Sequence, residues 1–299
     1  EVDYRDSRDG LARDALTEAL RSCAAVVCQL TDRIDADLLD AAPELRLIAN
    51  VAVGYDNIDV GAATARGIVV TNTPGVLTES TADLAFALLL AVGRRVGEAE
   101  RWLRAGNWRQ WEIDLLCGRE VHGATLGILG MGRIGQAVAR RARGFAMEVL
   151  YHSRRQLPES TERELGARFV TRAELFAAAD FVSLHLPLDA TTRGSIGAAE
   201  LRQMKSTACL INTARGGLVD DGALLAALRE GTLAGAGLDV FPAEPEVDPG
   251  YLELENVVLL PHIGSASVAT RTRMCLLAAE SVVAWVRGEV VPRQVGVEG

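Results

Sequence analysis

The stretch LGILGMGRIG, residues 126–135, joins an apolar run to three glycines at a characteristic spacing. In this pattern Gly130 permits a tight turn, Gly132 lets the backbone approach a phosphate group, and Gly135 lets a helix pack closely on a strand. Here an apolar strand precedes the glycines and a helix predicted over Ile134–Phe145 follows them, which is the context that this loop requires. The free N–H groups at the start of such a helix bind anions. A glycine-rich turn without a ligand is the alternative, but the context favours a dinucleotide-binding loop.

On both sides of this loop, short apolar runs alternate with amphipathic stretches. Before residue 93, strands are predicted over Ala24–Gln29, Leu47–Val51 and Ile68–Val70. After it, they are predicted over Leu126–Leu129, Glu148–Tyr151, Phe181–Leu184, Cys209–Asn212, Gly235–Leu238 and Val257–Leu260. Helices are predicted over Arg13–Arg21, Asp35–Ala41, Thr78–Val92, Asp221–Glu230 and Val268–Arg287. Strands that alternate with helices are typical of parallel βαβ units, so the sequence predicts an α/β fold with two units joined near residue 93.

Residues 94–123 interrupt this alternation. They contain three of the four tryptophans, Trp102, Trp108 and Trp111. Tryptophan is favoured in oligomer interfaces, which this segment would then form, but a packed connector is the alternative, and the composition leaves both interpretations open.

Charge and cysteine content exclude several classes of protein. The formal net charge of −9 and the pI of about 5.1 give no counterion-driven affinity for nucleic acid. The five cysteines form no Cys-x-x-Cys pair, which favours reduced thiols and a reducing compartment. The longest apolar run, Leu84–Val92, is too short to span a bilayer, and no signal peptide is evident. We therefore expect a cytoplasmic protein that binds neither membranes nor nucleic acid.

The end of the second strand of the nucleotide unit predicts which dinucleotide is used. Enzymes that use NAD place Asp or Glu there to bind the ribose 2′-hydroxyl. This chain has His152, Ser153, Arg154 and Arg155 instead. A carboxylate would repel the 2′-phosphate of NADP, whereas arginine pairs with it. The sequence thus predicts NADP(H), with NAD(H) as the alternative cofactor and solvated surface arginines as the alternative interpretation.

Charged side chains follow three further strands. Arg215 follows one strand, Asp239 and Glu244 follow the next, and His262 follows the last within a Pro-His-Ile-Gly-Ser loop. Ligands bind at the carboxyl ends of strands in open α/β sheets, and histidine is the usual general acid or base. His185 also ends a strand, but a structural role explains it at least as well.

With these motifs the chain resembles the D-isomer-specific 2-hydroxyacid dehydrogenases, and within them most closely the glyoxylate/hydroxypyruvate reductases. The likeness covers nearly the whole chain. It rests on VGYDNID (53–59), the loop of Gly130, NTARG (212–216), GLDVF (237–241) and PHIGS (261–265). The closer likeness rests on GRIGQA (132–137), YHSR (151–154) and VLLPH (258–262).

The resemblance implies the organisation of the chain. Residues 1–92 would begin a discontinuous, flavodoxin-like substrate domain, and 267–299 would return to it as a C-terminal helix. Residues 93–266 would form the Rossmann-type NAD(P)-binding domain, with a homodimerisation arm over 94–123. The family normally begins with a further strand and helix, so the substrate domain is expected to lack its first βα unit.

The resemblance also implies catalytic roles. Arg215 would bind the carboxylate of a small 2-keto acid and polarise its keto oxygen, since its planar fork matches a carboxylate. His262 would donate a proton to that oxygen while the nicotinamide donates a hydride, and Glu244 would hold the imidazole. The backbone N–H groups of Val53 and Gly54 would bind the other carboxylate oxygen. No metal is needed for this chemistry.

The resemblance implies a set of cofactor contacts as well, and Asp239 among them would bind the nicotinamide carboxamide. The other expected contacts are Thr81, Gly130, Gly132, Arg133, Ile134, Gly135, His152, Ser153, Arg154, Arg155, Leu186, Pro187, Thr192, Thr213, Ala214, His262 and Gly264.

The sequence leaves three alternative functions open. A phosphoglycerate dehydrogenase would belong to the same family but usually prefers NAD. A phosphite dehydrogenase would carry a lysine where this chain has Val53. A nucleotide-sensing corepressor on the same fold would retain the Arg, Glu and His without turnover. A tryptophan that some hydroxypyruvate reductases project into the neighbouring subunit's site is replaced here by Leu115, which leaves the preferred keto acid open.

Overall fold

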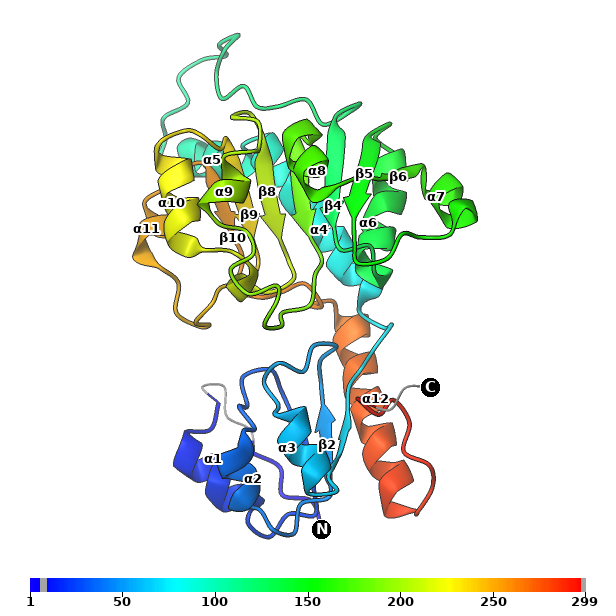
Figure 1. Ribbon diagram of the computed structural model, residues 1–299. Helices are drawn as coiled ribbons and strands as arrows, with labels where there is room; N and C mark the ends of the chain where they lie inside the picture. Colours follow the sequence, from blue (N-terminus) through cyan, green and yellow to red (C-terminus); the bar gives the residue numbers. More distant parts are fainter. Residues whose placement is uncertain (6–9, 297–299) are drawn as a thin grey trace. The chain divides into compact units, whose positions relative to one another are not determined.

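The computed structural model describes residues 1–5 and 10–296, and the chain divides into two units (Figure 1). One unit comprises 1–77 with 267–299, and the other comprises 78–266. The division therefore falls between Leu77 and Thr78 rather than near residue 93. The reason is helix α4 (Thr78–Gly93), which packs against α6 (Arg133–Arg143) and against strands of the larger unit.

The larger unit is built on one parallel sheet of seven strands in the order β10-β9-β8-β7-β4-β5-β6. The strands are β4 (Thr125–Leu129), β5 (Glu148–His152), β6 (Ala167–Phe169), β7 (Phe181–Leu184), β8 (Cys209–Asn212), β9 (Gly235–Leu238) and β10 (Val257–Leu259). The order reverses at β4, which gives the switch point of a doubly wound Rossmann-type sheet. The predicted Rossmann-type α/β fold is confirmed, and only the three-residue edge strand β6 was too short to predict from periodicity.

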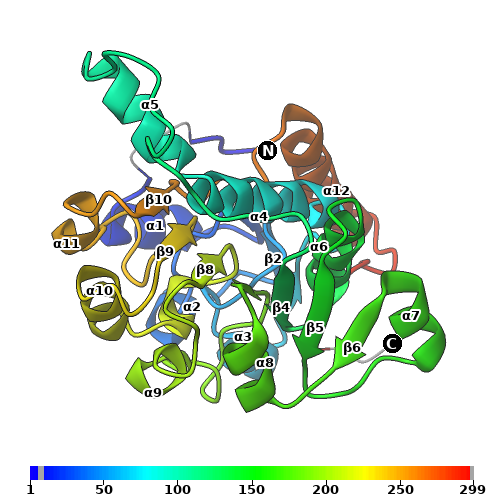
Figure 2. The same cartoon turned by 90° about the horizontal axis from the view of Figure 1, so that it is seen from above.

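Helices cover both faces of this sheet, as Figure 2 shows. On one face, α4 and α6 bury Phe86 and Val138 against the strands. On the other face, α8 (Arg172–Ala178) and α10 (Asp221–Arg229) bury Phe176 and Leu224. Parallel strands buried on both faces must be apolar throughout, which explains the uninterrupted apolar runs of the sequence. The unit is completed by α5 (Val96–Arg104), α7 (Glu159–Leu165), α9 (Ala198–Leu201) and α11 (Pro249–Leu252).

The smaller unit contains a parallel three-stranded sheet in the order β1-β2-β3. Its strands are β1 (Ala25–Cys28), β2 (Leu47–Asn50) and β3 (Val69–Thr71), and its helices are α1 (Arg13–Leu20), α2 (Ala36–Asp40), α3 (Val60–Ala65) and α12 (Val268–Val286). The long helix α12 packs against β1 and β2, so the C-terminal segment returns to this unit. In the described part of the chain, no helix has the length and apolar character needed to cross a membrane.

The turn between β4 and α6 depends on close packing at one of its glycines. A Cβ placed on Gly135 would lie 2.3 Å from the carbonyl oxygen of Gly130 and 3.2 Å from the side chain of Ile128. A Cβ on Gly132 would meet nothing within 4 Å. The helix can therefore approach the strand only because residue 135 lacks a side chain, whereas Gly132 faces open space.

We predict that Gly135→Ala destabilises the protein by about 2–3 kcal/mol, because the clash is with backbone that cannot rotate away. Gly132→Ala is the matched control and should change the free energy of unfolding by less than about 0.5 kcal/mol, since its φ of −75° suits alanine. Denaturant unfolding of the two variants measures the difference. Equal stability of both variants would contradict this account of the turn.

Candidate active site

The predicted site residues of the larger unit follow the carboxyl ends of adjacent strands. Gly130 follows β4, His152 ends β5, Leu186 follows β7, Thr213 follows β8 and Asp239 follows β9. The loop of His262 comes after β10. Because the strands are parallel and neighbours in the sheet, all of these segments reach the same edge.

The glycine loop at this edge fits a phosphate group. Gly130 has a φ of +98°, and its N–H donates to the carbonyl oxygen of His152 at 2.9 Å. A Cβ on Gly130 would lie 2.6 Å from the carbonyl oxygen of His185, so no side chain fits there. No side chain caps α6 at Gly132, and the backbone N–H groups of its first turn, which begins with Arg133 and Ile134, remain available to an anion.

The segment after β5 carries two exposed arginines. His152 is held in place, because its Nδ1 lies 2.9 Å from the carbonyl oxygen of Val170 and its ring stacks on Phe169. The hydroxyl of Ser153 donates to the carbonyl oxygen of Arg155 at 2.6 Å, which shapes the turn. Within residues 1–5 and 10–296, the exposed guanidinium groups of Arg154 and Arg155 form no ion pair or hydrogen bond, so both can take an external anion.

His262 and Glu244 form a hydrogen-bonded pair. Nδ1 of His262 lies 2.6 Å from Oε2 of Glu244, and Oε1 of Glu244 accepts the N–H of Phe241 at 2.9 Å. Burial opposes ionisation of Glu244, but the hydrogen bonds from His262 and Phe241 outweigh it and hold the pKa of that carboxyl below its ordinary value. The carboxylate is therefore charged at neutral pH, and it fixes Nδ1 so that Nε2 is the nitrogen that exchanges a proton.

Asp239 holds the turn that carries His262. Its carboxylate is fully buried and accepts the N–H groups of Ile263 and Gly264 at 2.8 Å each, while its carbonyl oxygen accepts the N–H of His262 at 2.9 Å. His262 has a φ of +53°, in the left-handed region that few non-glycine residues adopt. A Cβ on Gly264 would lie 3.3 Å from Asp239 and 3.4 Å from Thr81, so α4 reaches the same place. This holding role of Asp239 could not be predicted from the sequence, although the acid lies at a strand end.

Arg215 is brought near Glu244 by close backbone packing. A Cβ on Gly216 would lie 2.0 Å from the carbonyl carbon of Phe241, so the two segments touch. The positive charge of Arg215 is among the influences that lower the pKa of Glu244, which places the two groups in electrostatic reach. The buried amide of Asn212 bridges the turn, since it donates to the carbonyl oxygen of Arg215 at 2.9 Å and accepts the N–H of Ala214 at 3.1 Å. The structure thus groups Arg215, Glu244 and His262.

Two further segments complete this edge. The buried hydroxyl of Thr213 has no hydrogen-bond partner within the described ranges, so it is available to a ligand. The hydroxyl of Thr192 instead donates to the carbonyl oxygen of Pro187 at 2.7 Å and shapes its own loop.

Burial lowers the pKa of His185 to about 4, and its Nε2 lies 2.9 Å from the hydroxyl of Ser183. His185 is therefore a neutral structural residue, the interpretation that the sequence left open.

Val53 and Gly54 belong to the smaller unit, in the loop that follows β2. This loop lies at the carboxyl end of the three-stranded parallel sheet, as the other predicted site segments do in the larger sheet.

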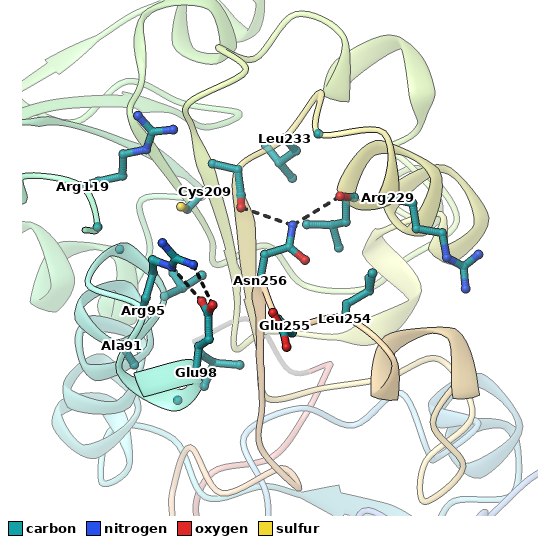
Figure 3. Close-up of a pocket in the computed structure, with 18 of the residues that line it drawn as sticks. Ala91, Arg95, Glu98, Arg119, Cys209, Arg229, Leu233, Leu254, Glu255 and Asn256 are labelled. Atoms are coloured by element: carbon teal, nitrogen blue, oxygen red, sulfur yellow. Dashed lines mark hydrogen bonds and ion pairs between the residues drawn. The ribbon is translucent and has the colours of Figure 1, made fainter. Parts of the chain in front are cut away.

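A cavity of about 770 Å³ lies elsewhere, at the amino ends of β8 to β10 (Figure 3). Arg95 and Glu98 form an ion pair of 2.6 Å in it, and Asn256 donates to the carbonyl oxygens of Leu228 and Ala234 at 3.3 Å each. None of the predicted site residues lines this cavity. Among the described residues, no group of three His, Cys, Asp or Glu side chains could hold a metal ion.

Known proteins with similar sequences belong to a dehydrogenase family that binds a nicotinamide dinucleotide. Residues 86–264 match the model of the D-isomer specific 2-hydroxyacid dehydrogenase NAD-binding domain. A glyoxylate reductase of Korarchaeum cryptofilum is 54% identical over 289 residues, covering 96% of this chain and 87% of that protein. A glyoxylate reductase of Thermococcus litoralis is 51% identical over 287 residues, with 95% and 86% covered.

A solved structure shows the same fold. The NADPH-dependent glyoxylate/hydroxypyruvate reductase of Sinorhizobium meliloti, in complex with NADP and malonate, matches with a TM-score of 0.85 and 39% identity, over 96% of this chain and 86% of that one. The resemblance predicted from the motifs is thereby confirmed. The chain belongs to the D-isomer specific 2-hydroxyacid dehydrogenase family.

Proposed function

We propose that the protein reduces a small 2-keto acid, glyoxylate or hydroxypyruvate, to the D-2-hydroxy acid, glycolate or D-glycerate, with a nicotinamide dinucleotide as reductant. The observation that carries this proposal is the grouping of Arg215, Glu244 and His262 at the sheet edge that also bears the glycine loop. The glyoxylate reductases that match nearly the whole chain at about half identity support the same substrate class.

The residues at this edge fit a dinucleotide. The open face of Gly132 and the N–H groups at the start of α6 would hold the pyrophosphate, and the buried hydroxyl of Thr213 would meet the nicotinamide end. Asp239 would support that end through the turn that it holds and through its carboxylate. Leu186, Pro187 and Ala214 would line the remaining surface. When bound, the dinucleotide supplies the hydride that reaches the keto carbon.

The proton comes from His262. Its Nε2 would donate to the keto oxygen, and the charged Glu244 would stabilise the imidazolium and fix the ring through Nδ1. Arg215 would bind the substrate carboxylate and stabilise the negative charge that develops on the keto oxygen. In the smaller unit, the N–H groups of Val53 and Gly54 would bind the carboxylate as well.

We predict that His262→Ala lowers kcat for glyoxylate by about 10²–10⁴-fold while the Kd for NADPH stays within about threefold, because only the proton donor is lost. His122→Ala removes an exposed histidine outside this edge and serves as the matched control. Steady-state kinetics across pH and a fluorescence titration of NADPH provide the measurements. Near-normal turnover of the His262 variant would remove this residue from the mechanism.

We further propose that NADP(H) is preferred to NAD(H), through Ser153, Arg154 and Arg155. The 2′-phosphate is an anion, and the two arginines at this strand end are exposed and unpaired within the described ranges. His152 occupies the place where NAD enzymes have an acid, and its ring is turned onto Phe169.

We predict that wild-type kcat/KM is higher with NADPH than with NADH and that the double variant Arg154→Gln/Arg155→Gln loses roughly tenfold or more of this preference. The reason is the loss of charge-assisted bonds to the 2′-phosphate. Arg163→Gln/Arg168→Gln is the matched control, because these exposed arginines already pair with Glu159 and Glu148. A wild-type preference for NADH at the same ionic strength would refute this assignment.

We also propose a homodimer that uses the arm over residues 94–123. Helix α5 buries no side chain, and Trp108, Trp111 and Ile113 are 58%, 74% and 80% exposed. The ends of the arm are tied together, since the N–H of Arg119 donates to the carbonyl oxygen of Gly93 at 2.7 Å and Gly118 packs against Gly93 and Arg94. Such a concentration of exposed aromatic side chains marks a protein interface.

We predict a dimer at micromolar concentration by light scattering and a weakened dimer in Trp108→Ser/Trp111→Ser, because both large apolar surfaces are removed. Val286→Ser, on α12 of the other unit, changes an equally exposed apolar residue and should leave the mass unchanged. A monomeric wild-type protein would exclude this role of the arm.

The cytoplasm is our proposed location. The five cysteines, Cys23, Cys28, Cys117, Cys209 and Cys275, are all free thiols, as a reducing compartment would keep them.

A further inference from the structure

The loop that follows β2 has three successive carbonyl groups held by hydrogen bonds. The oxygen of Ala52 accepts the N–H of Thr73 at 2.8 Å. The oxygen of Val53 accepts Nδ2 of Asn72 at 2.8 Å, and the oxygen of Gly54 accepts Nδ2 of Asn50 at 2.9 Å. The side chain of Asn72 thus holds the peptide group that carries the N–H of Gly54, which the proposed function uses, and the side chain of Asn50 holds the next peptide group, which carries the N–H of Tyr55.

These bonds also fix the direction of the N–H groups. A trans peptide group is planar, and its N–H points opposite to its carbonyl oxygen. Among the described residues, the only cis peptide bond is at Glu244–Pro245, so the loop peptides are trans. The carbonyl of Ala52 therefore sets the direction of the N–H of Val53, and the carbonyl of Val53 sets that of Gly54. In residues 1–5 and 10–296, neither N–H has an acceptor, so both are available to an anion.

The two asparagines are themselves held. Asn50 ends β2 and is fully buried, and its Oδ1 lies 3.5 Å from the thiol of Cys28. The second N–H of its amide donates to Oδ1 of Asn57 at 3.2 Å, while Nδ2 of Asn57 donates to the carbonyl oxygens of Gln29 and Asp32. The N–H of Asn72 donates to the carbonyl oxygen of Arg293 at 3.3 Å. The network thus connects the loop to both edge strands of the small sheet.

An asparagine suits each position because its amide is a neutral donor of the correct length. An aspartate of the same shape would place an acceptor against the carbonyl oxygen and repel it. An alanine would leave the carbonyl oxygen without its partner and free the peptide group to rotate.

We propose that Asn72 is a positioning residue that orients the N–H group of Gly54 toward the substrate carboxylate, and that Asn50 holds the following peptide group of the same loop. This inference rests on the proposed function, because it assumes that the N–H of Gly54 binds that carboxylate. The asparagines act through the backbone and touch no reacting atom.

The test uses Asn72→Ala and Asn72→Asp in the whole chain, because Asn72 is only half-buried whereas Asn50 is fully buried. The carboxylate contact is present in both ground and transition states, so its loss raises KM and leaves kcat nearly unchanged. We expect KM for glyoxylate to rise roughly tenfold or more in both variants, with kcat within about threefold of wild type. The Kd for NADPH should not change.

Asn256→Ala is the matched control. Asn256 also donates from Nδ2 to backbone carbonyl oxygens, but it does so in the cavity at the amino ends of the large sheet (Figure 3). Its loss should lower the melting temperature about as much as the loss of Asn72 and leave KM unchanged. A KM increase confined to the Asn72 variants separates positioning from stability.

A titration with oxalate, an unreactive dicarboxylate, distinguishes the inference from the proposed function. Oxalate binding to the NADP-loaded enzyme should weaken roughly tenfold in both Asn72 variants and remain normal in Asn256→Ala. Equal oxalate Kd values and equal glyoxylate KM values for wild type and the Asn72 variants would overturn the positioning role. Absence of 2-keto acid reduction by the wild-type protein would refute the proposed function itself, and the oxalate titration would still decide whether Asn72 controls carboxylate binding.

Discussion

All seven strands of the larger sheet run in one direction, so every strand-to-helix turn of that unit must lie at the same edge. This constraint brings together residues that are more than 100 positions apart in the sequence, from Gly130 to His262. The order of strands then separates the two halves of the site. The glycine loop and the arginines follow β4 and β5, whereas the turns of Arg215, Asp239 and His262 follow β8, β9 and β10 on the other side of the switch point. A dinucleotide that spans the switch point meets both groups.

Within this edge, the carboxylates of Asp239 and Glu244 respond to pH in opposite ways. Burial raises the pKa of Asp239, although its carboxylate accepts hydrogen bonds from two backbone N–H groups. The protein therefore loses stability as the pH rises from the ordinary pKa of an aspartate through the raised pKa, because the buried group then ionises. For Glu244 the hydrogen bonds outweigh burial and lower the pKa. The ionised carboxylate therefore stabilises the protein at any pH above the ordinary pKa of a glutamate, and this stabilisation is lost as the pH falls through the lowered pKa. A left-handed residue such as His262 costs about 1–2 kcal/mol, and the bonds to Asp239 offset this strain.

Much of this arrangement could be predicted from the sequence, because it depends on local signals. The glycine spacing and the apolar runs gave the nucleotide-binding unit, and charged residues after strands identified Arg215, Glu244 and His262 as site candidates. The boundary at Leu77 was not predictable, since α4 is equally apolar whichever unit it covers. The role of Asp239 in holding the turn depends on hydrogen bonds across 24 and 25 positions, which only the packed structure shows. The same holds for Asn50 and Asn72, whose partners are fixed by how the loop after β2 folds back.

The tied ends of the arm have an evolutionary consequence. Because the backbone at Gly118 and Arg119 contacts Gly93, the 24 residues between Gly93 and Gly118 form a segment that begins and ends at the same place on the larger unit. Exposed segments of this kind tolerate insertion, deletion and replacement, because no strand or core helix has to shift when their length or sequence changes. Selection can therefore alter the length and composition of this segment while the sheet edge that carries Arg215, Glu244 and His262 stays constant among descendants of one ancestral chain.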